Sequence, residues 1–461
     1  MLKFIGIVLG TTLLVSVSNA ANAQDSSSPT PEQRFFEWTG LKYEKAVYAG
    51  RRSRVMAELR QHDVDILIIP SAEGVSHGLT FRQSDDFMYF TGLELPHSIL
   101  VLNVDSDSST VFAPPRDTRF ESASRSNDFP GRPLADDPEI RTISGLDMVR
   151  TFGEFESTLA SWVSRDLVVS VNKGSRGPVT EIAKTFIMDW TPVMTLVDRI
   201  VDLHPQINLS NAYDSIARLR MVKQPEEIEI MRRVISLTAA AITHAAGFIE
   251  EGVDERTLEA ELEAVYKRGG AQRLSFSSII KSGPNSLWPW RVLAAHHDRR
   301  NRTMQDGDLV IFDVGTELDY YVSDVGRTFP VSGSFSAPQA RTMEMAISVS
   351  DAIISAVRPG ATFSGLLEAA VEATPEHERQ YMQTGSFFGH HIGMAAGDPS
   401  LFEAPLQPGM VFTIEPWYYN HDDNISVFIE DVVLVTEDGV EVLTAVLPRT
   451  PNDLARLVGK R

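Results

Sequence analysis

Five ionisable side chains interrupt segments of otherwise apolar, strand-like character in the second half of this 461-residue chain. In chain order they are Asp313, Asp324, His390, Glu415 and Glu430. Asp313 ends the run LVIFD, Glu415 lies in MVFTIEP, and Glu430 lies in SVFIEDVVLV. A carboxylate in a buried strand is costly unless it is paired with a cation or binds a metal. Each of these acids therefore needs a cationic partner or a metal.

Four carboxylates and one imidazole suit two divalent cations that are held close together and bridged by oxygen. Asp313 and Asp324 are eleven residues apart around a turn at Gly315, so a hairpin would place them on the same side. Taken singly, each residue has an ordinary interpretation, because aspartates near turns are common and a histidine such as His390 is more often a core residue. One dinuclear site explains all the buried acids together and indicates a hydrolase.

Composition limits the class of protein. The length predicts two or three domains, and 43% hydrophobic with 23% charged residues is typical of a soluble globular protein. The chain has no cysteine, which excludes disulfides and thiolate metal ligands. Its net charge of −20 argues against binding to nucleic acid.

The N-terminus has the features of an export signal. Lys3 precedes an apolar run from Phe4 to about Val17, and Ala21-Asn22-Ala23 fits a signal-peptidase site. The run is shorter than the roughly 20 residues of a membrane helix, although a retained anchor is the alternative. We expect a signal peptide over residues 1–23, a polar leader over 24–34, a periplasmic or secreted protein, and no membrane attachment after cleavage.

The two halves of the chain have different patterns. Short apolar runs alternate with helical patterns before about residue 204, which favours an α/β layer. Lys223-Gln224-Pro225-Glu226-Glu227 then places proline and acids at the first turn of a helix that we expect to reach about Ile249. A second helix is expected from Glu255 to Arg268, followed by strands and further helices. We predict an α/β (α+β) protein with domains at 35–210 and 211–461.

The order and spacing of several segments resemble the pita-bread metallopeptidases, and most closely aminopeptidase P and prolidase. The resemblance covers nearly the whole chain after the signal peptide. It implies an N-terminal creatinase/prolidase-like domain with a mixed sheet, a C-terminal pita-bread catalytic domain with a curved antiparallel sheet, and a homodimer or homotetramer. The matching segments are FRQSDDFMYFTGLELPHSILVL, LRMVKQPEEIEIMRR, DGDLVIFDVG, SDVGRTFPVSGSF and LQPGMVFTIEP.

The resemblance also implies a role for each candidate ligand. Asp313 would bind one metal, His390 and Glu415 would bind the other, and Asp324 and Glu430 would bridge the two. The oxygen-rich ligand set favours Mn(II), with Co(II) or Zn(II) as replacements. A hydroxide between the metals would be the nucleophile.

Two residues receive catalytic roles from the same resemblance. Glu415 would take a proton from the nucleophilic water and pass it towards the leaving amine. His296 matches the family histidine that binds substrate and helps to stabilise the tetrahedral intermediate. The alternative for His296 is an ordinary surface histidine in the segment AAHHDRR.

The chain departs from the family pattern around the ligands. Gly397 and Ser386 stand where histidines are usual, and Phe428 replaces an arginine. The chain is also longer than usual around Trp288–Trp290. His391 is a candidate substrate-binding residue that would take over the role of a missing histidine. Removal of one electrophilic donor commonly costs about 2.7–4 kcal/mol of transition-state stabilisation.

Three functions remain open from the sequence. The first is an exported, metal-dependent aminopeptidase that removes a residue preceding proline. The second is a prolidase-type dipeptidase, towards which the longer segment at Trp288–Trp290 would narrow the site. The third is a binding protein that keeps the fold without peptidase activity. Retention of all five ligands argues against the third, whereas Gly397 and Phe428 argue modestly for it.

Overall fold

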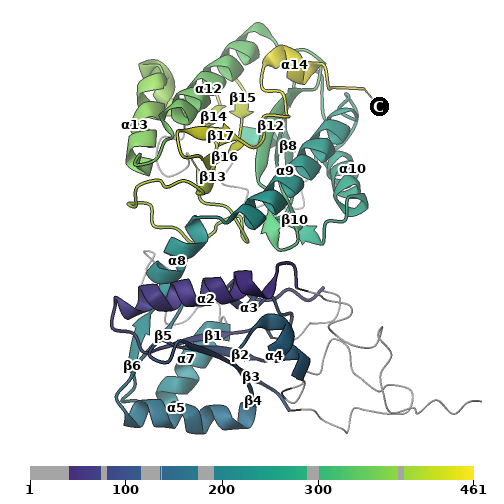
Figure 1. Cartoon of the computed structure of the whole chain (residues 1–461). Coiled ribbons are helices and arrows are strands. Elements are labelled where there is room, and N and C mark those ends of the chain that lie inside the picture. Colours follow the sequence, from purple (N-terminus) through teal and green to yellow (C-terminus); the bar gives the residue numbers. More distant parts are fainter. Residues whose placement is uncertain are drawn as a thin grey trace, which may run out of the picture.

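A computed structural model of the chain shows two α/β domains stacked one above the other (Figure 1). The predicted signal peptide and leader lie outside the residues that it describes, as do His296, Ser386 and Trp288–Trp290. Among the described helices, none combines the length and the apolar character needed to cross a membrane. The described residues are 41–73, 80–115, 135, 138–174, 192–287, 301–382 and 389–460.

The N-terminal domain is built on a six-stranded mixed sheet of order β4-β3-β2-β1-β5-β6. Neighbours β1–β2 and β2–β3 are antiparallel, whereas β1–β5, β5–β6 and β3–β4 are parallel. This confirms the predicted mixed sheet. The strands are β1 (Ile66–Pro70), β2 (Ile99–Asn103), β3 (Ser108–Ala113), β4 (Met148–Thr151), β5 (Val168–Val171) and β6 (Asn208–Asn211).

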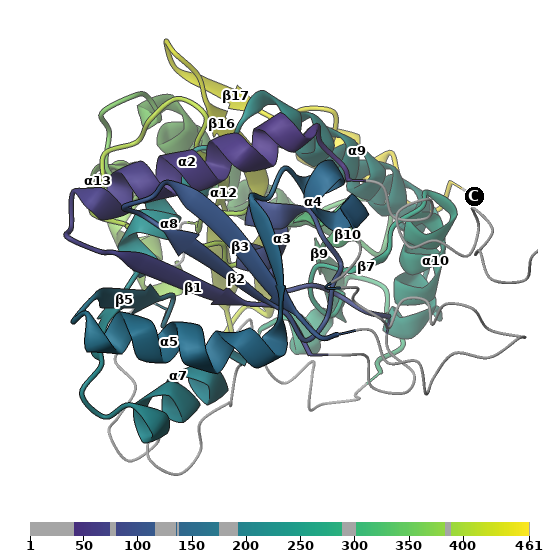
Figure 2. The same cartoon turned by 60° about the horizontal axis from the view of Figure 1, so that its bottom comes forward.

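Helices cover both faces of this sheet because successive residues of each strand point to opposite sides. Leu67 and Ile69 of β1 pack on the side of α2 and α3, whereas Ile66 and Ile68 pack on the side of α5 and α7. Figure 2 shows these two layers from below. The helices are α2 (Lys45–Arg60), α3 (Asp85–Thr91), α4 (Pro138–Ser144), α5 (Phe155–Ser164) and α7 (Pro192–Leu203), with the 3₁₀ turn η3 (Phe152–Glu154).

Helix α8 links the two domains, and helices α9 and α10 of the second domain start where the sequence predicts. Pro225 is at the first turn of α9, and Gln224 and Glu227 form a reciprocal capping box. The helix ends at Ala246, somewhat before the expected Ile249, and α10 has the predicted bounds. The helices are α8 (Tyr213–Met221), α9 (Pro225–Ala246), α10 (Glu255–Arg268), α12 (Ala337–Ala356), α13 (Phe363–Ala373) and α14 (Pro451–Ala455), with the 3₁₀ turns η4 (Gly283–Leu287) and η6 (Glu376–Tyr381).

Small antiparallel sheets form the centre of this domain. Their strand orders are β11-β10-β7, β12-β9-β8 and β13-β16-β17, with the pair β14-β15. An isolated antiparallel bridge pairs Gly326 of β12 with Glu430, the residue before β16. The strands are β7 (Arg273–Leu274), β8 (Ile279–Ser282), β9 (Leu309–Val314), β10 (Thr316–Leu318), β11 (Tyr321–Val322), β12 (Val325–Pro330), β13 (Val411–Ile414), β14 (Trp417–Asn420), β15 (Ile425–Phe428), β16 (Asp431–Val435) and β17 (Val440–Val442).

Candidate metal centre

The two aspartates are placed by the pairing of β9 with β12. Asp313 lies near the end of β9, opposite Gly326 of β12, and Asp324 immediately precedes β12. The segment between them is not the simple turn that the sequence predicts, because β10 and β11 form a separate small hairpin. Gly315 allows the two chain segments to approach closely, since a Cβ there would lie 1.9 Å from the carbonyl oxygen of Ser323. The predicted proximity of the aspartates nevertheless arises from strand pairing.

Thr413 of β13 connects two candidate ligands that are distant in sequence. The amide of Thr413 donates to the carbonyl of His390 at 2.9 Å, and the amide of His390 donates to Oγ1 of Thr413 at 3.1 Å. The Thr413 hydroxyl in turn donates to Oε1 of Glu415 at 2.9 Å. Gly389 makes this approach possible, because a Cβ at its φ of 141° would lie 1.7 Å from the Thr413 carbonyl oxygen. Sequence reasoning missed Thr413, although its place two residues before Glu415 on a strand puts both side chains on one face.

The backbone of Glu430 is held in place by the buried ion pair of Arg327 and Asp431. Its amide donates to the carbonyl of Gly326 at 3.0 Å, and Nη1 of Arg327 donates to the Glu430 carbonyl at 2.6 Å. Arg327 also donates to Oδ1 of Asp431 at 2.7 Å, and both side chains are fully buried. These two charged residues were not selected from the sequence, although each is adjacent to a residue of the Gly326–Glu430 bridge.

The ligand atoms of Asp324, His390 and Glu430 converge within 4.8 Å of one another. Nε2 of His390 is 3.5 Å from Oδ2 of Asp324 and 3.4 Å from Oε1 of Glu415. Two buried carboxylate oxygens, Oδ1 of Asp324 and Oε2 of Glu430, have no hydrogen-bond partner among the described residues. Buried oxygens normally have partners, so these two fit a group that binds between them.

The electrostatics of the site also fit a cation. Burial raises the pKa values of Asp313, Asp324 and Glu430 well above the ordinary carboxyl range, and repulsion from neighbouring carboxylates adds to the rise. Burial also raises the pKa of Glu415, but the nearby His390 and hydrogen bonds from Thr413 and Trp417 oppose the rise. So many buried acids cannot all ionise together unless positive charge lies between them.

The structure does not support the substrate-binding role considered for His391. Its side chain is fully buried, and its ring packs on Phe363 and Phe412 at centroid distances of 5.4 and 5.9 Å. Burial in this apolar pocket lowers the pKa of His391 to about 3. The adjacent His390 is about a third exposed. Because neighbouring residues of an extended chain point to opposite sides, only one of the two histidines reaches the site.

Phe428 and Gly397, which depart from the family pattern, have different surroundings: the first is packed among aromatic groups and the second has open space beside it. Phe428 is buried and stacks on Trp417, with ring centroids 3.8 Å apart and planes inclined by 27°. Its ring also covers Gly326, where a Cβ would lie 2.1 Å from a Phe428 ring carbon. A Cβ at Gly397 would have no atom outside its immediate neighbours within 4 Å. An aromatic stack therefore occupies the position where the resemblance led us to expect an arginine.

Comparisons with known proteins agree with this geometry. Residues 229–437 match the family model of metallopeptidase family M24, and residues 48–169 match that of the aminopeptidase P N-terminal domain. The chain is 28% identical to the mitochondrial intermediate cleaving peptidase 55 of Arabidopsis thaliana, over 91% of this chain and 83% of that protein. It is 27% identical to the Xaa-Pro aminopeptidase of Escherichia coli K12, over 88% of this chain and 96% of that protein.

Solved structures share the complete two-domain fold. The aminopeptidase P of Escherichia coli with the inhibitor Pro-Leu superposes with a TM-score of 0.72 and 25% identity. The aminopeptidase PepP of Pseudomonas aeruginosa gives a TM-score of 0.72 and 27% identity. Each match covers 90% of this chain and 98% of the other. Fold and site thus define a two-domain metallopeptidase. Residues 229–437 form a metallopeptidase domain of family M24, and the chain is a metallo-exopeptidase that is similar to aminopeptidase P in both domains.

Proposed function

We propose that this enzyme removes an N-terminal residue that precedes proline, using a hydroxide that bridges two divalent metal ions. Mn(II) is the proposed metal because the ligand set is rich in oxygen, and Co(II) or Zn(II) would replace it. The substrate class is supported by similarity to proteins named Xaa-Pro aminopeptidase from two bacteria. The substrates would be peptides with proline in the second position.

One observation carries the proposal. Oδ1 of Asp324 and Oε2 of Glu430 are buried without hydrogen-bond partners among the described residues, close to the imidazole of His390. A buried carboxylate oxygen without a donor loses the solvation that it had in water. Cations bound between these atoms would replace the solvation that both oxygens lose on burial. This gives a physical reason why neither oxygen has a hydrogen-bond donor beside it.

Each carboxylate has a proposed role. Asp324 and Glu430 would bridge the metals, Asp313 would bind one, and His390 and Glu415 would bind the other. Glu415 would also transfer the proton from the nucleophilic water to the leaving amine. The hydrogen bond from Thr413 to Oε1 of Glu415 holds that oxygen 3.4 Å from Nε2 of His390.

His296 is the proposed substrate-binding histidine, which would hydrogen-bond the developing tetrahedral intermediate. We expect His296→Ala to lower kcat about 10²–10³-fold, the usual effect of losing one such donor. Metal affinity should stay unchanged because His296 is not a proposed ligand. Metal titration beside steady-state kinetics separates the two effects, and a loss of metal binding would contradict this role.

The central experiment compares Mn(II)-loaded wild type with Asp324→Asn on Xaa-Pro-Yaa, Xaa-Pro and Xaa-Ala-Yaa peptides. Asp306→Asn is the matched control, because Asp306 is an exposed aspartate outside the centre. Cleavage of Xaa-Pro-Yaa alone, lost in Asp324→Asn and kept in Asp306→Asn, is the expected result. No turnover of any proline peptide by a metal-loaded wild type would overturn the proposal.

A prolidase-type dipeptidase is the second candidate. The chain is 25% identical to the Xaa-Pro dipeptidase of Pongo abelii, over 90% of this chain and 94% of that protein. Cleavage of Xaa-Pro without cleavage of Xaa-Pro-Yaa would favour this candidate. The two candidates differ in whether the site accommodates substrate residues that follow the proline.

Export and assembly are further parts of the proposal. We propose cleavage after Ala23, release into the periplasm or medium, and a homodimer or homotetramer. N-terminal sequencing of the mature protein tests the first point, and light scattering tests the last. A mature protein that still begins at Met1 would contradict the export proposal.

A further inference from the structure

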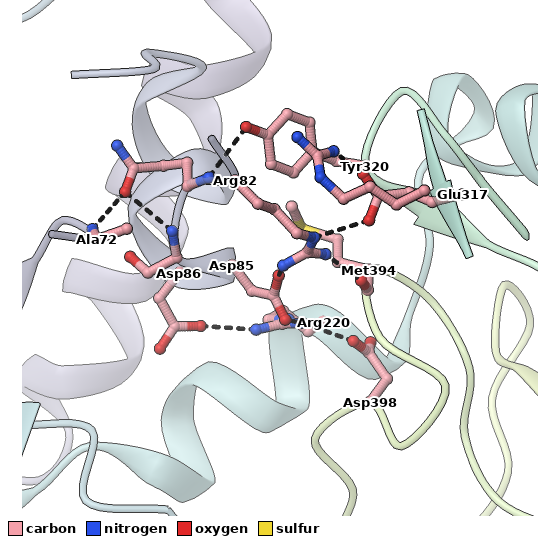
Figure 3. Close-up of polar contacts among 12 residues, drawn as sticks. Ala72, Arg82, Asp85, Asp86, Arg220, Glu317, Tyr320, Met394 and Asp398 are labelled. Atoms are coloured by element: carbon pink, nitrogen blue, oxygen red, sulfur yellow. Dashed lines mark hydrogen bonds and ion pairs between the residues drawn. The ribbon is translucent and has the colours of Figure 1, made fainter. Parts of the chain in front are cut away.

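The guanidinium of Arg82 connects the two domains through three different segments (Figure 3). Its Nε donates to Oε2 of Glu317 in β10, its Nη1 to Oδ1 of Asp85 in α3, and its Nη2 to the carbonyl of Met394, each at 2.7 Å. Arg82 itself lies in the N-terminal domain, just before α3. Two nitrogens of the guanidinium therefore reach across the domain boundary, while the third is hydrogen-bonded within the N-terminal domain to Asp85.

Met394 belongs to a loop, Gly393–Asp398, that is hydrogen-bonded to residues within two positions of two candidate ligands. The amide of Asp398 donates to the carbonyl of His391, the residue after His390, at 3.0 Å. The amide of Val322, two residues before Asp324, donates to the carbonyl of Gly393 at 2.9 Å. A shift of the loop would therefore move the backbone on both sides of the centre.

The far end of the loop is held by a buried ionic cluster. Oδ1 of Asp398 lies 2.5 Å from Nη2 of Arg220, and Oδ2 lies 3.1 Å from Nζ of Lys223. Arg220 also contacts Oδ2 of Asp85 at 3.3 Å, while Oδ1 of that carboxylate accepts from Arg82. The contacts thus form a closed ring. It leads from Arg82 to Asp85, Arg220 and Asp398, then along the loop to Met394, whose carbonyl accepts from Arg82.

The loop is tightly packed where it begins, at Gly393. A Cβ at Gly393 would lie 2.5 Å from Oδ2 of Asp398 and 3.0 Å from Cε of Lys223, so the chain is folded tightly onto this carboxylate. Charge-assisted hydrogen bonds are shorter and stronger than neutral ones, and a guanidinium fixes their directions. The carbonyl of Met394 is therefore held by a donor whose own orientation is set by Glu317 and Asp85.

We propose that Arg82 is a positioning residue for the proposed peptidase reaction. From the N-terminal domain it fixes the Gly393–Asp398 loop, and through the loop it sets the backbone that carries His390 and Asp324. This inference rests on the proposed function for its catalytic consequence. Its structural part concerns metal affinity and loop order, which are measurable without turnover.

The competing interpretation is that Arg82 only holds the domains together. Arg218 of α8 supplies a matched control, because its Nε lies 3.4 Å from Oε1 of Glu58 in α2. That pair also joins the N-terminal helical layer to a later segment, but within the described part of the chain Arg218 makes no hydrogen bond or ion pair with the Gly393–Asp398 loop. If Arg82 contributed only an ion pair between packed segments, its variants should behave like those of Arg218.

The test compares R82A and R218A in the full-length mature protein. We expect R82A to raise the dissociation constant for Mn(II) about 10–100-fold, as for residues that orient metal ligands, and to lower kcat/KM to a similar degree. Amide hydrogen exchange at Gly393 and Asp398 should accelerate in R82A. R218A should change Mn(II) affinity less than about twofold, because an exposed ion pair contributes little.

R82K provides a second variant that keeps the charge. Lysine lacks the planar guanidinium with its fixed donor directions, so it cannot hydrogen-bond Glu317, Asp85 and the Met394 carbonyl at the same time. We expect R82K to retain wild-type thermal stability while its Mn(II) affinity and loop exchange remain impaired. If R82A does not fold, R82K carries the same comparison with R218A.

Two failures are distinguishable. Equal Mn(II) affinity and equal loop exchange in the Arg82 and Arg218 variants would overturn the positioning role, even if the wild type cleaves Xaa-Pro-Yaa. A wild type that binds Mn(II) but cleaves no proline peptide would overturn the proposed function. In that case a selective loss of Mn(II) affinity in R82A would still support the positioning role.

Discussion

Two sets of buried carboxylates in this molecule have opposite electrostatic properties. Asp398 at the domain boundary and Asp431 behind the sheet have lowered pKa values, because arginine and lysine side chains outweigh the effect of burial. Asp313, Asp324 and Glu430 are equally buried, yet their pKa values are raised. Burial alone therefore does not identify a functional acid, whereas burial without a cationic side chain does.

The difference has a simple physical meaning. A paired buried acid contributes to the stability of the fold, because its partner's charge replaces lost hydration. An unpaired cluster reduces the stability of the metal-free fold and gains its compensation only when cations bind. The same protein therefore contains one set of acids that serves folding and one that is suited to binding.

The largest expected effect comes from breaking the paired set. Asp398→Asn leaves the charges of Arg220 and Lys223 buried without their shared carboxylate, so we expect it to lower the free energy of unfolding by about 3–5 kcal/mol. Urea unfolding of metal-free protein measures this loss. A change below about 1 kcal/mol, the range of exposed pairs, would contradict the structural role of Asp398.

Asp324→Asn should have the opposite effect on the metal-free protein. Removal of one charge from the unpaired cluster relieves repulsion, so we expect the apo protein to be equally or more stable. Mn(II) affinity should fall more than about 100-fold, since even residues beyond the ligands cost 10–100-fold. Calorimetric titration beside thermal unfolding provides both values. A destabilised apo variant would show that Asp324 belongs with the paired acids.

The pH dependence sharpens the contrast further. Because the raised carboxyls bind protons more tightly in the folded state, the apo protein should lose stability as pH rises from about 4 through their raised folded pKa values. Asp398 and Asp431 have lowered pKa values, so their contribution is present above about pH 4 and is lost in stronger acid. Melting curves from pH 4 to 8 in a chelator and in Mn(II) measure this dependence. An identical pH profile in both conditions would contradict the cation-binding assignment.

Thr413→Val is expected to have the smallest effect. It removes the hydroxyl that donates to Glu415 and accepts from the His390 amide, while it keeps the shape of the side chain. We expect a loss of about 0.5–1.5 kcal/mol in unfolding free energy and about tenfold in activity, measured by urea unfolding and peptide hydrolysis. Loss of stability with full activity would mean that Thr413 supports only the strand.

Local patterns predicted much of the fold. The proline and acids at residues 223–227 predicted the start of α9, and the apolar runs predicted most strands. The proximity of Asp313 and Asp324 also followed from local reasoning, because a short chain segment joins them. The β10–β11 hairpin was missed, because the two residues of its turn, Asp319 and Tyr320, have positive φ values without a glycine that would indicate such a turn.

Contacts between distant segments could not be predicted in this way. Arg82 and the Met394 carbonyl are 312 residues apart, and no periodicity connects them. The burial of His391 could not be predicted for a similar reason, because the pocket of Phe363 and Phe412 is assembled only in the folded chain. Family resemblance supplied the ligand set, but only tertiary structure separates His390 from its neighbour.

The apolar core has a consequence for how this enzyme denatures. One continuous cluster includes Leu59 and Phe87 of the first domain together with Ile242 and Phe412 of the second. The ionic ring through Arg82 crosses the same boundary. Melting of either half would expose core surface of the other, so the chain should behave as a single cooperative unit in calorimetry. Damage to the amino-terminal half would then deprive the cell of the catalytic half as well.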